Sequence, residues 1–324
     1  MARGTLWNGI LALIAVALVA MPAAAEERPG AKKRTRPDAP LAAKAEPAPP
    51  QPASPEGFVK DQEFARPGGR ASLKLDLFLP PAGARPFPLV VFIHGGGWQT
   101  GGKGQCPARY LGPKGYAVAS ISYRLSQQAK FPAQIEDCKA AIRWLRANAQ
   151  MYGLDGERIG VWGSSSGGHL AALLGTTGDV AALDGTGGNA GVSSRVQAVV
   201  DWFGPTDFLQ MDAHAPADSR IQHDSPASPE SNLVGGPIQE NKEACAKASP
   251  LTYVSRDDPP FLIMHGDKDN LVPIHQSEIL HAALHRVGLE STFIPVEGAG
   301  HGFSGDEHYK KVEEFFDRHL KRTR

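Results

Sequence analysis

The sequence contains few cysteines, with Cys106, Cys138 and Cys245 the only three among 324 residues. In an exported protein, three thiols allow at most one internal disulfide and leave one thiol over. A Cys106–Cys138 bridge is an open alternative, because the sequence does not fix the separation of the two residues. No cysteine precedes Cys106, which excludes a lipid-modified cysteine near the N-terminus. None lies on a sharp strand-to-helix turn, which disfavours a cysteine nucleophile.

The chain also lacks an excess of charge of either sign, since 34 Lys and Arg residues balance 34 Asp and Glu residues. Without a net field, we expect no nucleic-acid partner and no attraction to an anionic membrane. A metal-ligand cluster is missing too: His281 and His285 share a helical face, but no third ligand accompanies them. Exposed helix histidines are therefore expected, with no metal and no cofactor.

The apolar run at residues 10–20 is shorter than the ~20 residues that a membrane-spanning helix needs. Small residues follow it at 23–25, so residues 1–25 are predicted to be a secretory signal peptide. The expected location is secreted or periplasmic, with no stable membrane insertion after cleavage. Residues 26–57 are rich in proline, alanine and charge, which predicts a disordered linker.

The remainder, residues 58–324, is predicted to be one catalytic domain of the α/β class. Apolar strand-like runs alternate with helical patterns, which favours a mostly parallel central sheet with helices on both faces. Strands are expected at residues 73–79, 89–93, 116–123, 158–162, 196–203, 260–264 and 292–296, and helices at 133–151, 168–174, 274–287 and 309–320. Residues 204–250 are long, polar and rich in Pro, Ser and Asp, which is typical of a lid or substrate-binding insertion, with a surface excursion as the alternative.

The pattern Gly-x-Ser-x-Gly at residues 163–167 lies between a buried strand-like run and a small-residue helix. In that setting it predicts a nucleophile elbow, a turn so sharp that only glycines fit beside the central serine. The hydroxyl of Ser165 would then stand clear at the top of the sheet. An ordinary serine-rich turn is the alternative for the five-residue pattern taken alone.

Upstream, the strand at residues 89–93 runs into the sequence His-Gly-Gly-Gly-Trp at 94–98. Glycines after a buried strand let backbone N–H groups approach a substrate and stabilise the oxyanion that forms when a carbonyl is attacked. We predict Gly96, Gly97 and Ser166 as the donors, with Gly95 as the substitute. A flexible glycine-rich loop is the alternative.

A serine hydroxyl needs a base to take its proton, and the base needs a carboxylate to orient it. In this fold the acid follows the serine along the chain, and the histidine follows the acid. His301, flanked by glycines after the last predicted strand, is the predicted base. Two aspartates compete for the third role after the preceding strand. Asp269 lies further along the loop, where it can reach a histidine on the next loop, and is preferred. Asp267, at the strand exit, is expected to bond nearby turn N–H groups.

Taken together, these motifs resemble the α/β-hydrolase superfamily, in the branch with a His-Gly-Gly-Gly oxyanion loop. More narrowly, the chain is similar to secreted bacterial carboxylesterases grouped with bifunctional acetylxylan and feruloyl esterases. The likeness is carried by residues 94–98, 122–125, 131–137, 163–168, 202–207, 265–269 and 300–302. One departure is Ser164, where hormone-sensitive-lipase relatives usually carry Asp, and it favours the feruloyl and acetyl esterase side.

The resemblance implies a secreted serine carboxylesterase that hydrolyses short-acyl or aryl esters through an acyl-enzyme. Its substrate would be a small ester or an acylated plant polysaccharide carrying acetyl or feruloyl groups. Trp98, Trp202 and Phe203 are predicted to flank the acyl group. One alternative is a prolyl-oligopeptidase-like peptidase, which normally carries a propeller that the short linker cannot supply. The other is a non-catalytic carbohydrate-binding homologue, which the complete triad disfavours.

Overall fold

A computed structural model describes residues 57–69, 72–81 and 83–321. The predicted signal peptide at residues 1–25 and nearly all of the predicted linker lie outside this part. Within the described residues, no helix is both long and apolar enough to span a bilayer. The first described strand begins at Phe58.

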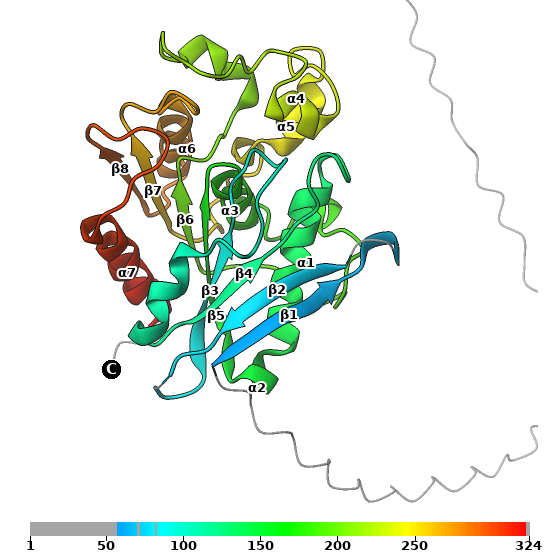
Figure 1. Cartoon of the computed structure of the whole chain (residues 1–324), viewed down its shortest axis with the longest axis vertical. Coiled ribbons are helices and arrows are strands. Elements are labelled where there is room, and N and C mark those ends of the chain that lie inside the picture. Colours follow the sequence, from blue (N-terminus) through cyan, green and yellow to red (C-terminus); the bar gives the residue numbers. More distant parts are fainter. Residues whose placement is uncertain (1–56, 70–71, 82, 322–324) are drawn as a thin grey trace, which may run out of the picture. The chain divides into compact units, whose positions relative to one another are not determined.

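A single eight-stranded sheet forms the centre of the described part, in the order β1-β2-β4-β3-β5-β6-β7-β8 (Figure 1). The strands are β1 Phe58–Ala65, β2 Leu73–Phe78, β3 Phe87–Ile93, β4 Ala117–Ile121, β5 Leu154–Ser164, β6 Ala198–Trp202, β7 Phe261–Gly266 and β8 Ser291–Val296. Strand β2 pairs antiparallel with β1 and β4, and the other neighbours pair parallel. The predicted mostly parallel sheet is therefore confirmed, while β1 was missed because most of its residues are exposed or half-buried.

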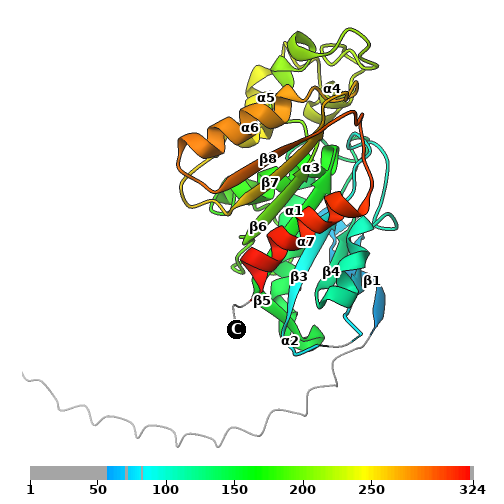
Figure 2. The same cartoon turned by 90° about the vertical axis from the view of Figure 1, so that its left-hand side faces the viewer.

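Helices cover both faces of this sheet, as predicted. Their bounds are α1 Ala133–Ala147, α2 Ala149–Tyr152, α3 Ser166–Thr176, α4 Pro229–Val234, α5 Lys242–Ala248, α6 His275–Arg286 and α7 Asp306–Leu320. Buried residues of α1, α3 and α6 share one core cluster with the sheet. Those of α7 and of the 3-10 helix Pro107–Lys114 share the other, and Figure 2 shows α7 lying across the sheet.

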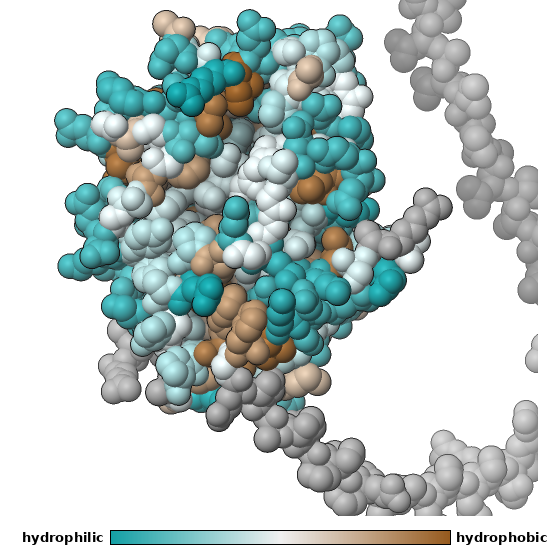
Figure 3. Space-filling model, in the orientation of Figure 1, coloured by the Kyte–Doolittle hydropathy of each residue, from teal (hydrophilic) through white to brown (hydrophobic). Residues whose placement is uncertain are grey.

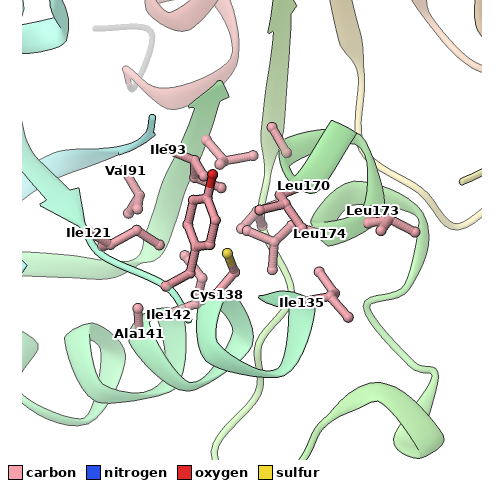
Figure 4. Close-up of a cluster of buried hydrophobic side chains, with 14 of the residues drawn as sticks. Val91, Ile93, Ile121, Ile135, Cys138, Ala141, Ile142, Leu170, Leu173 and Leu174 are labelled. Atoms are coloured by element: carbon pink, nitrogen blue, oxygen red, sulfur yellow. The ribbon is translucent and has the colours of Figure 1, made fainter. Parts of the chain in front are cut away.

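The two core clusters, one on each face of the sheet, explain why β3 is apolar at every position, since a strand covered on both faces has no solvent side. All seven residues of β3 are buried, and Val91 and Ile93 meet Ile142 and Leu170 from α1 and α3 (Figure 4). Each such side chain contributes about 1.5–3 kcal/mol on burial. Outside the core, hydrophilic side chains cover much of the face in Figure 3.

The cysteines are all free thiols, so the possible Cys106–Cys138 bridge is absent. Cys138 lies in the core cluster with α1 and α3, whereas Cys106 packs against the cluster on the opposite face of the sheet. The sheet therefore separates the two sulfur atoms. Burial raises the pKa of the Cys106 thiol to about 11.

The insertion at residues 204–250 folds into short helices joined by turns, with α4 and α5 in its second half. These lie at the top of Figure 1, beyond the carboxyl ends of the parallel strands. The insertion is thus placed where ligands bind in open α/β sheets. That it opens and closes as a lid stays a prediction.

Candidate active site

Ser165 lies at the turn between β5 and α3, with φ 55 and ψ −126. Non-glycine residues rarely adopt a positive φ, and such strain persists where the surroundings hold it. Here the N–H of Ser165 donates to the carbonyl of Trp202 at 2.8 Å, while its carbonyl accepts from the N–H of His169 at 3.1 Å. The turn is thereby fixed to both β6 and α3.

The two glycines of the elbow are required by close backbone approach. A Cβ at Gly163 would lie 2.0 Å from the carbonyl oxygen of Gly167, and one at Gly167 would lie 2.1 Å from that of Ile93. Any side chain at either position would collide with main-chain atoms. The sequence pattern and the local geometry therefore have the same cause.

The three side chains predicted as nucleophile, base and acid meet at the carboxyl ends of β5, β8 and β7. His301 Nε2 lies 2.9 Å from Ser165 Oγ, and His301 Nδ1 lies 2.7 Å from Asp269 Oδ2. A carboxylate only accepts, so Nδ1 carries the proton and Nε2 is free to accept the serine hydrogen. This is the tautomer that a general base for serine requires.

Asp269 is buried, and its Oδ1 accepts the N–H groups of Leu271 at 2.8 Å and Val272 at 2.9 Å. Burial alone would raise the pKa of Asp269, but hydrogen bonds from His265 and His301 outweigh it and hold that pKa well below its ordinary value. The carboxyl group is therefore ionised and can stabilise an imidazolium on His301.

The competing aspartate has a different partner. Asp267 Oδ1 accepts the N–H of Gly298 at 2.7 Å, which ties the strand exit to the loop that follows β8. The structure thus brings Asp269, and not Asp267, to His301.

A second histidine, His265, holds Asp269 from the other side and was missed in the sequence. It is fully buried, with Nε2 at 2.9 Å from the carbonyl of Val272 and 3.2 Å from Asp269 Oδ2. Its Nδ1 lies 2.7 Å from Ser277 Oγ. Because a carbonyl only accepts, Nε2 carries a proton, and the Ser277 hydroxyl can donate to Nδ1. The signal was a histidine at the end of a buried strand, four residues before the acid.

The glycine loop supplies unpaired N–H groups beside the nucleophile. Gly96 and Gly97 have φ of 114 and 59, and within the described residues neither N–H has a hydrogen-bond acceptor. A Cβ at Gly95 would lie 2.8 Å from the carbonyl of Ser164, so the loop lies directly against the elbow. The N–H of Ser166 opens α3, where helix geometry leaves it without an intrahelical acceptor and the helix dipole favours negative charge.

His94 and Tyr123 support this loop from below. Their rings stack with centroids 4.4 Å apart, and His94 Nδ1 donates to the Gly95 carbonyl at 2.8 Å. The Tyr123 hydroxyl donates to the His94 carbonyl at 3.1 Å. Burial lowers the pKa of His94, which keeps the ring neutral.

Ser165 and His301 open into a cavity of about 740 Å³. The oxyanion loop forms one side of it, and the insertion adds Ile221, His223, Pro229 and Glu230. A cavity of about 860 Å³ elsewhere, lined by α5 and by the two residues that precede α1, includes neither Ser165 nor His301 in its wall. Among the described residues, no cluster of three or more His, Cys, Asp or Glu side chains could hold a metal ion.

Two of the three predicted pocket aromatics line this cavity. The Phe203 ring lies 4.7 Å from the His301 ring. Trp98 also borders the cavity, but its side chain is 1% exposed and packs against His169 and Phe208. Trp202 corrects the prediction, since its side chain packs against Trp162 in the core cluster under α7. Successive strand residues point to opposite faces, and Trp202 ends β6 on the face away from the cavity. Its carbonyl still contributes, through the bond to Ser165.

A family model described as BD-FAE matches residues 75–284, a span that includes Ser165 and Asp269 but ends before His301. Among curated proteins, the esterase LipC of Mycobacterium tuberculosis is 33% identical over 223 residues, which cover 68% of this chain and 54% of that protein. The chain spans about half the length of the curated relatives it matches.

Solved structures of esterases are also similar to this chain. A truncated carbohydrate esterase from gut microbiota is 35% identical, with a TM-score of 0.75 over 82% of this chain and 97% of that one. A bifunctional GH43-CE protein from Bacteroides eggerthii is 40% identical, with a TM-score of 0.73 over 81% of this chain and 38% of that one. With the sheet described above, these matches establish the α/β-hydrolase fold.

Proposed function

Because this chain belongs to the BD-FAE family, we propose that it is a serine carboxylesterase. The observation that carries the proposal is the hydrogen-bonded line Ser165–His301–Asp269, which lies in a cavity beside unpaired N–H groups. The relatives named above as esterases support the same activity.

In the proposed reaction, His301 Nε2 takes the proton from Ser165 as its Oγ attacks the ester carbonyl. The carbonyl oxygen gains negative charge, which the N–H groups of Gly96, Gly97 and Ser166 stabilise. When the tetrahedral intermediate collapses, His301 gives its proton to the departing alkoxide and an acyl-enzyme remains. Water then attacks the acyl group while His301 takes its proton, the bond between the acyl carbon and Ser165 Oγ breaks, and His301 returns the proton to Oγ as the carboxylic acid leaves.

For the substrate, we propose short-acyl or aryl esters, with acetyl or feruloyl groups on plant polysaccharide as the natural source. Two structural relatives are a carbohydrate esterase and a protein that joins GH43 to a CE module, which supports this class. The 740 Å³ cavity has room for a small acyl group together with part of a sugar.

The decisive measurement compares 4-nitrophenyl acetate with an aminoacyl-anilide, followed by acetate release from acetylxylan and hydrolysis of methyl ferulate. We expect turnover of the ester and little or none of the anilide. Anilide cleavage at a comparable kcat/KM would instead make the chain a peptidase, and turnover of neither would leave a non-catalytic homologue.

We also propose that residues 1–25 direct export to the periplasm or the medium. Small residues after an apolar run support this. Amino-terminal sequencing of the protein from periplasmic and extracellular fractions should find a start just after residue 25. Full-length protein confined to the cytoplasm would contradict the proposal.

A further inference from the structure

A buried histidine–glutamate pair in the cavity wall takes no part in the mechanism above. His223 Nδ1 lies 3.2 Å from Glu230 Oε1, and the two side chains are 0% and 4% exposed. Both residues line the cavity that contains Ser165 and His301. Burying an ionisable pair is costly unless its remaining polar atoms find partners.

Those partners are incomplete in the protein itself. Within the described residues, Glu230 Oε2 and both ring nitrogens of His223 are buried without a hydrogen bond of good geometry, although Nδ1 lies 3.2 Å from Glu230 Oε1 and the Leu271 backbone carbonyl also faces the imidazole ring. Burial lowers the pKa of His223, but the contact with Glu230 outweighs it and leaves that pKa above its ordinary value. The pair therefore keeps unsatisfied hydrogen-bonding capacity, an N–H of the imidazole and an oxygen of the carboxylate, in two residues that line the cavity.

The backbone around the pair is fixed in place. Asp212 accepts the N–H groups of His223 at 2.7 Å and Asp224 at 2.8 Å. Glu230 lies in the first turn of α4, whose N-cap Ser228 accepts from the N–H of Ser231 at 3.0 Å. These bonds fix the backbone on both sides of the pair, so that only side-chain rotation is needed to bring the buried polar atoms to a ligand.

The pair also lies close to the reacting centre. Pro229, next to Glu230, is so near the oxyanion loop that a Cβ at Gly97 would lie 3.3 Å from the Pro229 Cβ. A group attached to an ester carbonyl held by that loop can therefore extend toward the pair.

We propose that His223 and Glu230 form a subsite for two hydroxyl groups on the alcohol side of the ester, which selects esters of sugars. A hydroxyl accepts from the histidine, and a neighbouring hydroxyl donates to the carboxylate. An apolar alcohol leaves the histidine and the carboxylate without hydrogen-bond partners, which lowers the kcat/KM for its ester. The inference rests on the proposed esterase function and narrows its substrate to polyhydroxylated alcohols.

The test uses a mono-acetylated methyl xyloside and cyclohexyl acetate, which have rings of equal size but differ in their hydroxyl groups. Acetate release gives kcat/KM for both with the wild-type protein, Glu230→Gln and His223→Gln. We expect the wild type to prefer the xyloside ester and each variant to lower the ratio of the two kcat/KM values by about ten- to a hundredfold, mainly through KM. The matched control is Asp201→Asn, which changes another buried carboxylate outside the cavity wall and should leave the ratio as it is.

A second measurement needs no variant and decides the matter if the substitutions prevent folding. Methyl xyloside should inhibit hydrolysis of 4-nitrophenyl acetate competitively. Its inhibition constant should be at least about tenfold lower than that of cyclohexanol. Equal inhibition by the two alcohols would overturn the subsite.

The remaining outcomes are distinguishable. Equal losses for both acetates in the variants would show that the pair only supports the insertion, and an effect confined to methyl ferulate would place it on the acyl side. Either result overturns the subsite while the esterase stands. If 4-nitrophenyl acetate is not hydrolysed at all, the proposed function itself fails.

Discussion

Replacing Asp269 by asparagine should lower kcat for 4-nitrophenyl acetate by about four orders of magnitude. That loss corresponds to about 5–6 kcal/mol of transition-state stabilisation. The carboxylate lies 2.7 Å from His301 Nδ1 with none of its side chain exposed, so water cannot replace it. An amide neither stabilises the imidazolium nor requires a proton on Nδ1, and its NH₂ can donate to Nδ1 and force the proton onto Nε2. His301 then cannot accept the hydrogen of Ser165.

The matched control is Asp267→Asn, the same substitution two residues earlier. The amide oxygen can still accept from the N–H of Gly298, so we expect kcat within about threefold of the wild type, or less than ~1 kcal/mol. Steady-state kinetics, labelling rates with a fluorophosphonate and circular dichroism would be recorded for both variants. If the Asp267 variant lost activity while folded and the Asp269 variant kept it, the assignment of the acid would be refuted.

Three further outcomes are expected. Ser165→Ala should lose several orders of magnitude in kcat. In the wild type, mass spectrometry should find a fluorophosphonate on Ser165 and on neither neighbouring serine. Because Phe203 closes part of the cavity wall beside His301, nitrophenyl acetate and propionate should have a higher kcat/KM than the decanoate. Each methylene that fits is worth ~1–3 kcal/mol, and a maximum at long chains with interfacial activation would indicate a lipase. Burial raises the pKa of Asp201 to about 7, so ionisation disfavours the folded state. The free energy of unfolding should therefore fall by up to about 4 kcal/mol as the pH rises from about 4 to about 7. Urea unfolding of Asp201→Asn should lack this fall, and parallel pH profiles of the variant and the wild type would contradict the prediction.

The parallel sheet was predictable because its physical cause is visible in single segments. Residues 89–93 form an unbroken apolar run, and the structure buries every residue of β3. Strand β1 gave no such signal, since its sequence Phe-Val-Lys-Asp-Gln-Glu-Phe-Ala has four consecutive polar residues at its centre and lies on an exposed edge. An edge strand is defined by its pairing with a neighbour, in this case β2, and less by its own composition.

The elbow and the oxyanion loop were predictable for a different reason. Collisions with backbone atoms at 2.0–2.8 Å require every one of their glycines except Gly97, which is required by its φ of 59, so the residue type reports the geometry directly. Trp202 shows the limit of this reasoning. Its position at the carboxyl end of β6 was correct, but a shift of one residue along a strand reverses the face, and the side chain enters the core instead of the cavity.

His223 and Glu230 could not be paired from the sequence, although they lie seven residues apart. That spacing places two residues on one face of a helix, yet only Glu230 is in a helix, and the residues between them form turns. Their contact depends on how Asp212 holds one turn and how Ser228 caps α4. Side chains placed by such irregular local bonds leave no periodic pattern in the sequence. The polar contacts of the insertion could therefore be found only in the structure, and substrate selection in the proposed subsite depends on them.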